Sequence, residues 1–268
     1  MAYKVKRGQG GRVPINLTPF GATDSLWTGN TWEVPDDDIL ARWIAWVAIG
    51  QAFHVAEILH SADPVGTSPT NEAAKADAVE LLTQKGADPW HRDGWMFQVM
   101  SWLAAHVGRP GALIALPHLI HAEKGLDGLE ILLDASQNVV ATIIFEDKAT
   151  ENPRDTIRDD VWPEFVKFES GHGVNRLTQQ ASGILAAAQH PNPTAAINRI
   201  SWNTTRRYRI SITAGKSTPA SRKRLFKDYE TKVMGHLDRR RAEVFLVDDV
   251  RAWMANLATK AIAQVATF

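Results

Sequence analysis

The feature that most constrains this chain is a pair of apolar, strand-like runs separated by a short polar segment. The runs cover residues 126–133 and 139–147, and residues 134–138 between them are rich in turn-forming side chains. This pattern predicts an antiparallel hairpin whose turn is centred between Ser136 and Gln137. Because strand side chains alternate between two faces, the turn position decides which residues meet across the pair.

Three charged side chains lie at the open end of this predicted hairpin. The register places Asp127 directly opposite Glu146, and facing residues in a sheet have Cβ atoms about 4.5–5.5 Å apart. Lys148 comes two residues after Glu146, so strand alternation places it on the same face. We therefore expect two carboxylates and one amine to converge there.

Two carboxylates this close repel each other unless a cation joins them. Oxygen ligands without histidine or cysteine favour Mg²⁺ or Mn²⁺, with water and substrate phosphate completing the octahedron. Asp127 and Glu146 are the expected side-chain ligands, and the main-chain carbonyl of Asp147 is a further candidate. Lys148 would orient or deprotonate the attacking water, or stabilise charge on the phosphate. The pattern predicts metal-assisted phosphodiester hydrolysis; the competing interpretation is a surface strand in which Glu146 only pairs with Lys148.

Around the hairpin, the chain predicts helices before it and alternating helices and strands after it. Residues 1–35 suggest an irregular arm, and three acids at 36–38 suit the first turn of a long apolar helix that ends near residue 61. The other expected helices cover residues 71–85, 93–107, 174–189, 220–237 and 249–266, with further strands at 208–213 and 242–247. This order indicates a mixed α/β or α+β fold. We place an N-terminal arm and helical region at 1–90 and a second domain at 91–268.

The segments G-L-D-G at 125–128 and E-D-K at 146–148 resemble the active-site pattern of the PD-(D/E)xK nucleases, which have the restriction-endonuclease-like fold. The resemblance implies a central mixed sheet flanked by helices, in an αβββαβ core from about residue 93 to 214. It also implies that Asp127 and Glu146 are metal ligands and that Lys148 is the catalytic lysine. Leu126 occupies the position of the proline in the family name.

The resemblance also draws attention to residues on the neighbouring helices. Some members of the superfamily carry a glutamate on the helix before the motif, where this chain has only Gln98. RecB-like members place a glutamine on the helix after the motif, which makes Gln179 and Gln180 accessory candidates. Glu123, shortly before Asp127, is a further candidate for an accessory acid.

Positive charge is concentrated in one part of the chain although the net charge is zero. Between residues 199 and 241, thirteen Lys and Arg accompany three acids. Such an excess predicts a polyanion partner, which we expect to be DNA, with RNA not excluded. The alternative is a solvated surface neutralised by the acidic first half of the chain. The expected contacts are Arg206, Arg207 and Arg209 on a strand, and Arg222, Lys223, Arg224 and Lys227 on a basic helix.

The chain has no cysteine, which excludes disulfides and thiolate metal sites. Its first residues lack the apolar run of a secretory signal, and the apolar segment at 39–59 contains charged and polar residues. We therefore expect a cytoplasmic protein without a membrane span.

Together these patterns predict a Mg²⁺-dependent DNA endonuclease, and the resemblance implies a role in restriction or anti-phage defence. Nucleases of this kind often act beside a helicase or sensor protein, and the apolar helix at 39–59 could dock such a partner. Many also dimerise, so a homodimer is a further expectation. Two alternatives remain: a nucleic-acid-binding or assembly subunit that keeps the fold without turnover, and a phosphatase-like enzyme acting on small phosphates.

Overall fold

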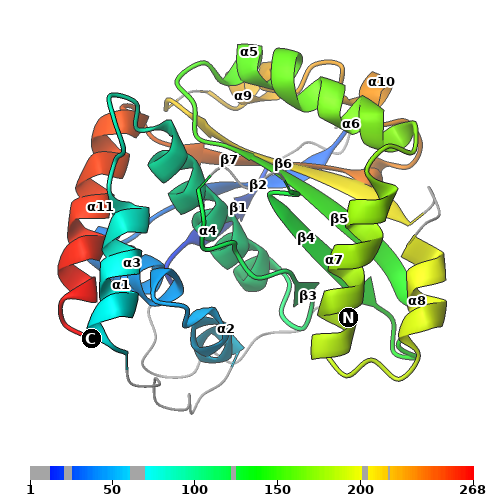
Figure 1. The fold of residues 1–268 in the computed structure, drawn as a ribbon. Coiled ribbons are helices and arrows are strands. Elements are labelled where there is room, and N and C mark those ends of the chain that lie inside the picture. The colour runs from blue at the N-terminus through cyan, green and yellow to red at the C-terminus, as the bar shows by residue number, and fades with distance from the viewer. Residues whose placement is uncertain (1–12, 21–25, 61–69, 122–124, 201–204, 217) are drawn as a thin grey trace.

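The computed structural model describes residues 13–20, 26–60, 70–121, 125–200, 205–216 and 218–268 (Figure 1). The accessory candidate Glu123 lies outside these ranges. The described part of the chain has a mixed α/β fold, in which a curled seven-stranded sheet is flanked by helices. Its strands are β1 (Asn16–Pro19), β2 (Thr28–Glu33), β3 (Leu113–Ile114), β4 (Gly128–Leu133), β5 (Val139–Lys148), β6 (Arg206–Ala214) and β7 (Arg240–Leu246).

The sheet is mixed, with the strand order β1-β2-β7-β6-β5-β4-β3. Strands β2, β7, β6 and β5 run parallel, whereas β1 at one edge and β4 and β3 at the other pair antiparallel. Parallel neighbours need long crossovers that pass over a face of the sheet. The crossovers are α5 (Pro153–Thr156), the π-helix η1 (Ile157–Val161), α6 (Trp162–Glu169), α7 (Val174–Ala187) and α8 (Pro193–Ile200) before β6, and α9 (Pro219–Leu225), α10 (Tyr229–Lys232) and the 3₁₀ turn η2 (Leu237–Arg239) before β7. Apolar residues of these crossovers share one buried cluster with β4, β5, β6 and β7.

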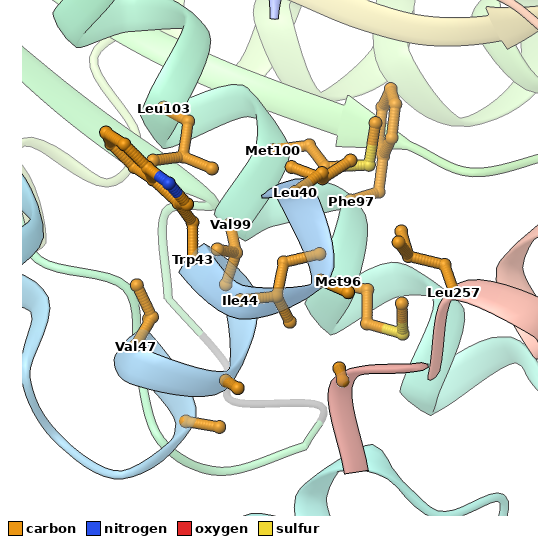
Figure 2. Close-up of a cluster of buried hydrophobic side chains, with 14 of the residues drawn as sticks. Leu40, Trp43, Ile44, Val47, Met96, Phe97, Val99, Met100, Leu103 and Leu257 are labelled. Atoms are coloured by element: carbon orange, nitrogen blue, oxygen red, sulfur yellow. The ribbon is translucent and has the colours of Figure 1, made fainter. Parts of the chain in front are cut away.

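A second buried cluster lies among the helices outside the crossovers, and it involves the two ends of the chain. Figure 2 shows Leu40 and Ile44 of one helix beside Met96 and Met100 of another and Leu257 near the C-terminus. The helices concerned are α1 (Asp37–Ala48), α2 (Ala52–His60), α3 (Glu72–Leu82), α4 (Trp90–Gly108) and α11 (Val250–Val265). Residues on both sides of the expected 90/91 boundary therefore share one core.

This packing reduces the surface that the apolar segment at 39–59 offers to a partner. Trp43 and Val47 of α1 are buried together with Leu40 and Ile44, so the apolar face of α1 is covered by the protein's own helices. The run is also two helices rather than one, because the chain turns at Gly50, whose φ of 82° lies in the left-handed region. The expected start is confirmed, since the Asp36 side chain accepts hydrogen bonds from two first-turn amides.

Two other expectations are also wrong. The segment predicted as an irregular arm contains β1 and β2, which extend the sheet beyond β7. The predicted basic helix at 220–237 is broken into α9, α10 and η2, with left-handed residues at Asp228 and Gly235. Tyr229 explains part of this break, because it is buried and its hydroxyl donates to the carbonyl of Tyr208 on β6. Among the helices within the described ranges, none has the length and apolarity required to cross a membrane.

Candidate active site

The hairpin of β4 and β5 has the register predicted from the sequence. Gly128 faces Phe145, and the pairing continues in that register to the end nearest the turn, where a bulge shifts only Leu133. Continuing the register one residue beyond Gly128 sets Asp127 opposite Glu146. The predicted register is confirmed.

Local hydrogen bonds in the turn explain why this register forms. One oxygen of the Asp134 side chain accepts from the amides of Ser136 and Asn138, at 2.9 and 2.8 Å. Gln137 takes the left-handed conformation with a φ of 63°, which lets the chain reverse within a few residues. The turn therefore fixes the register from sequence-local interactions.

At the open end of the hairpin, the three charged side chains converge as expected. The Lys148 ammonium lies 2.6 Å from Glu146 Oε1 and 3.7 Å from Asp127 Oδ2. The main-chain amide of Asp147 donates to Asp127 Oδ2 at 2.8 Å, which ties the end of β4 to β5. Asp127 is thus held in place by the neighbouring strand before any ligand arrives.

Helix α4 supplies a further contact, from Gln98. Its side-chain amide donates to Asp127 Oδ1 at 2.7 Å, so both carboxylate oxygens of Asp127 accept a hydrogen bond. Gln98 lies on the helix where some PD-(D/E)xK nucleases carry a glutamate. The helix before the motif therefore reaches the site through an amide donor, which orients Asp127 without adding negative charge.

Burial shapes the electrostatics of this cluster. Desolvation, with the charge of Asp127 second, raises the pKa of Glu146 to about 7. Burial alone would lower the pKa of Lys148, but the Glu146 and Asp127 carboxylates outweigh it and the net shift is upward. The ammonium therefore holds together two acids that would otherwise repel each other.

Asp147 lies on the opposite face of β5 and has a different environment. Its carboxylate accepts from the Ser101 hydroxyl on α4 at 2.7 Å, and burial raises its pKa to about 7. Arg209 on β6 lies on the same side, with its guanidinium carbon 4.3 Å from the Phe145 ring centroid and a hydrogen bond to the Ser101 carbonyl. These buried groups support the strand from behind and do not face the cluster.

The residues fit a hard divalent cation. Two carboxylates already bracket one positive charge, that of Lys148, and Mg²⁺ and Mn²⁺ prefer such oxygen ligands. In an extended strand the amide and the carbonyl of one residue point to the same side. Because the Asp147 amide points to Asp127, its carbonyl is directed to the same side and can contribute an oxygen ligand.

A cavity of about 400 Å³ opens onto Asp127, Glu146 and Lys148. Its other walls are formed by η1, α6 and α7, which carry Asp160, Glu164, Lys167 and Arg176 among other residues. Sequence reasoning did not single out Arg176. Residues three and four apart share a helix face. The spacing of Arg176 from the accessory candidates Gln179 and Gln180 could therefore have identified it from the sequence. The two glutamines line the adjoining cavity instead of this one.

Two of the arginines predicted to bind nucleic acid are not on the surface. Arg206 and Arg209 are each 2% exposed, and Arg206 donates to the Phe168 carbonyl. Arg207, two residues before Arg209 and on the same face of β6, pairs with Asp238 at 2.7 Å. The arginine pattern predicts a strand but does not tell whether its faces are exposed to solvent. In the structure, helices cover both faces of β6. Because both guanidinium groups are buried, the predicted contacts of Arg206 and Arg209 with nucleic acid are wrong.

Other cations of the basic segment are also engaged inside the fold. Arg239 pairs with Glu169, Arg241 pairs with Glu243, and Arg240 donates to main-chain carbonyls. The positive excess read from the sequence therefore overstates the charge available to a partner. In α9 and the segment that follows it, Lys223, Arg224 and Lys227 are exposed and Arg222 is half-buried.

No model of a known protein family matches the chain, and no curated protein matches it.

Proposed function

We propose that this protein is a metal-dependent nuclease that hydrolyses phosphodiester bonds of DNA. The observation that carries the proposal is the convergence of Asp127, Glu146 and Lys148 at the floor of one cavity. Two hard-oxygen ligands for a cation and one amine beside them suit metal-assisted attack of water on a phosphodiester. A surface ion pair would not need the raised pKa of Glu146 or the amide contacts that fix Asp127.

The order of the elements also supports the proposal. Helix α4, strands β3, β4 and β5, helix α7 and strand β6 occur in the αβββαβ order of the restriction-endonuclease-like fold, with α5, η1, α6 and α8 as further elements between β5 and β6. The acids lie at the end of the hairpin where that superfamily has its active site. This agreement is an argument by analogy, and it makes the nuclease the first reaction to test.

Each residue has a defined task in the proposed reaction. Asp127 and Glu146 would hold the cation, which would supply acidification of a water and neutralisation of charge on the phosphate. Gln98 and the Asp147 amide keep Asp127 oriented. The upward shift in the pKa of Lys148 keeps its ammonium form, which favours stabilisation of developing negative charge over proton abstraction.

The exposed cations of α9 and the segment after it, Lys223, Arg224 and Lys227, are the proposed contacts to the DNA backbone. Arg222 beside them and Arg207 on β6 stay secondary candidates. A role in restriction or anti-phage defence remains a prediction from the resemblance, as do a partner protein and a homodimer.

Cleavage of DNA with Mg²⁺, supplied both as plasmid and as a single-stranded oligonucleotide, tests the proposal. Glu146→Gln and Lys148→Met keep the size of each side chain, and Glu130→Gln is the matched control. Glu130 is a buried acid on β4 that pairs with Arg109 and lies away from the cavity. We expect cleavage by the wild type and by Glu130→Gln, and a loss of about a hundredfold or more in the two site variants. Equal cleavage by all four proteins would refute the assignment.

The same proteins separate the alternatives. A subunit that keeps the fold without turnover would bind DNA but cleave none, and Mg²⁺ would not change its thermal unfolding. A phosphatase-like enzyme would release phosphate from small monoesters and leave the plasmid intact. Both measurements use the wild type with Glu146→Gln as the inactive reference.

A further inference from the structure

We infer that the active site takes an unpaired nucleic-acid strand, and that the apolar cavity next to the catalytic cavity receives a nucleobase adjoining the scissile phosphate. This inference rests on the proposed function and specifies its substrate. It concerns a second cavity, of about 820 Å³, whose size is within the range of ligand-binding pockets.

The two cavities adjoin each other. Gly125, Leu126 and Arg176 line both, so the second cavity begins beside Asp127. It lies between α7 and the segment around β3, and Figure 1 shows these two elements beside each other. A phosphate at the carboxylates and a group in the second cavity can therefore belong to one nucleotide unit.

The lining of the second cavity suits a flat apolar ring with polar edges. Its apolar side chains include Leu113, Ile114, Leu116 and Ile184. Gln179, Gln180 and His118 add groups that both donate and accept hydrogen bonds, as the edges of bases require. A purely apolar partner would not use these amides, and a simple phosphate would not use the apolar wall.

Helix α7 offers a smooth wall to such a ring. Gly183, Ala187 and Ala188 line the cavity without long side chains. A Cβ built on Gly183 meets nothing within 4 Å, so the space beside this part of the helix is open. A planar base can lie close to the helix there.

An exposed aromatic side chain also lines the cavity. Phe53 at the start of α2 is 66% exposed and lines the cavity together with Leu116, which is 40% exposed. Exposed aromatics of this kind stack on unpaired bases in proteins that bind single strands. Bases inside a duplex are already stacked and paired, so their faces are not accessible to this cavity.

Arg176 connects the two parts of the argument. Its side chain lines both cavities, so a guanidinium lies where a strand passing from the carboxylates to the apolar cavity carries its phosphate. The two adjoining cavities thus combine a candidate cation site, a candidate phosphate contact and an apolar site for a base. This combination favours one nucleotide held at its phosphate and its base.

A cavity-filling substitution tests the inference. Gly183→Leu adds a side chain to the open space, and leucine is also a better helix former than glycine. Ala186→Leu is the matched control, since Ala186 is exposed on the same helix and does not line the cavity. Phe53→Ala is an independent variant that removes a mostly exposed ring, with little consequence for folding.

Binding is measured in EDTA by fluorescence anisotropy, so that no cleavage occurs. The probes are a labelled thymidine oligonucleotide, its duplex with the complementary strand, and a strand of equal length without bases. We expect the wild type and Ala186→Leu to bind the single strand about tenfold more tightly than the other two probes. Gly183→Leu and Phe53→Ala should lose this preference. Equal binding of all probes by the wild type, or an unchanged preference in both cavity variants, would overturn the inference.

Cleavage with Mg²⁺ separates this inference from the proposed function. Single-strand binding that depends on Gly183 and Phe53, without cleavage, supports the base site and contradicts the nuclease. Cleavage of duplex and single strand at equal rates by the wild type and by Gly183→Leu supports the nuclease and contradicts the base site.

Discussion

Replacing Glu146 by glutamine should stabilise the metal-free protein at alkaline pH, because an ionised carboxylate is unfavourable at this position. Its side chain is 14% exposed and faces Asp127 across the hairpin. Burial is the larger cause of the raised pKa, and the neighbouring charge is the second. Glutamine keeps the shape of the side chain and removes the charge.

The magnitude follows from the pKa. A change from 4.5 to about 7 on folding corresponds to about 3 kcal/mol between the two protonation states. The folded state binds the proton more tightly than the unfolded state, so ionisation lowers the free energy of unfolding. This penalty is absent below pH 4.5, grows as the pH rises from there, and is complete above about pH 7. Glu146→Gln should therefore gain up to about 3 kcal/mol at pH 8 and little at pH 4.5.

Urea unfolding of wild type and Glu146→Gln in EDTA, from acidic to alkaline pH, measures this gain. Lys148 loses its nearer partner in the variant but keeps Asp127 at 3.7 Å, which limits the offsetting loss. Glu130→Gln should instead lower the free energy of unfolding, since it leaves the Arg109 guanidinium without its carboxylate. A difference between wild type and Glu146→Gln that is the same at every pH would refute the electrostatic argument.

Three further predictions follow from the same contacts. Mg²⁺ should bind the wild type more tightly as the pH rises through about 7 and should release protons, because the cation favours ionised Glu146. Calorimetry in two buffers of different ionisation enthalpy measures the released protons, and Mg²⁺ binding independent of pH would contradict the prediction. Gln98→Ala should lower kcat/KM about tenfold through loss of its hydrogen bond to Asp127, with no change in DNA affinity; an unchanged rate would show that the amide does not orient the acid. Arg209→Met should lower the free energy of unfolding by about 3–5 kcal/mol, because Asp147 loses a buried cation. It should leave the salt dependence of DNA binding unchanged, whereas Lys227→Ala should reduce the slope of log binding constant against log salt concentration by about 1.

The hairpin was predictable because everything that sets it is local. The turn residues, the apolar alternation and the acids lie within one short stretch, and Asp134 fixes the turn through its own neighbours. The same is true of the helix start at Asp36, where a side chain caps amides two and three residues away. Such features depend on few distant contacts, so a sequence pattern can identify them.

The wrong expectations were decided by distant residues. Arg209 looks like a surface arginine in the sequence, but Phe145 and Trp32 cover its guanidinium from two other strands. The apolar segment at 39–59 looks like one helix in the sequence, but it is two helices, and α1 packs against α4 and α11. Arg176 and Gln98 enter the site area only because α7 and α4 pack beside the hairpin. Periodicity identifies an element and its apolar face, but which element covers that face depends on the whole chain.

Strand β5 shows how one short segment can serve both the site and the core. Glu146 and Asp147 are adjacent acids, and burial raises the pKa of each to about 7. Strand alternation sends Glu146 to the cavity, where a cation can reach it, and Asp147 to α4, where Ser101 holds it. A raised pKa alone therefore does not distinguish a reactive acid from a structural one, and the face of the strand does. The register of the hairpin, set by a turn far from the cavity, decides which acid meets Asp127.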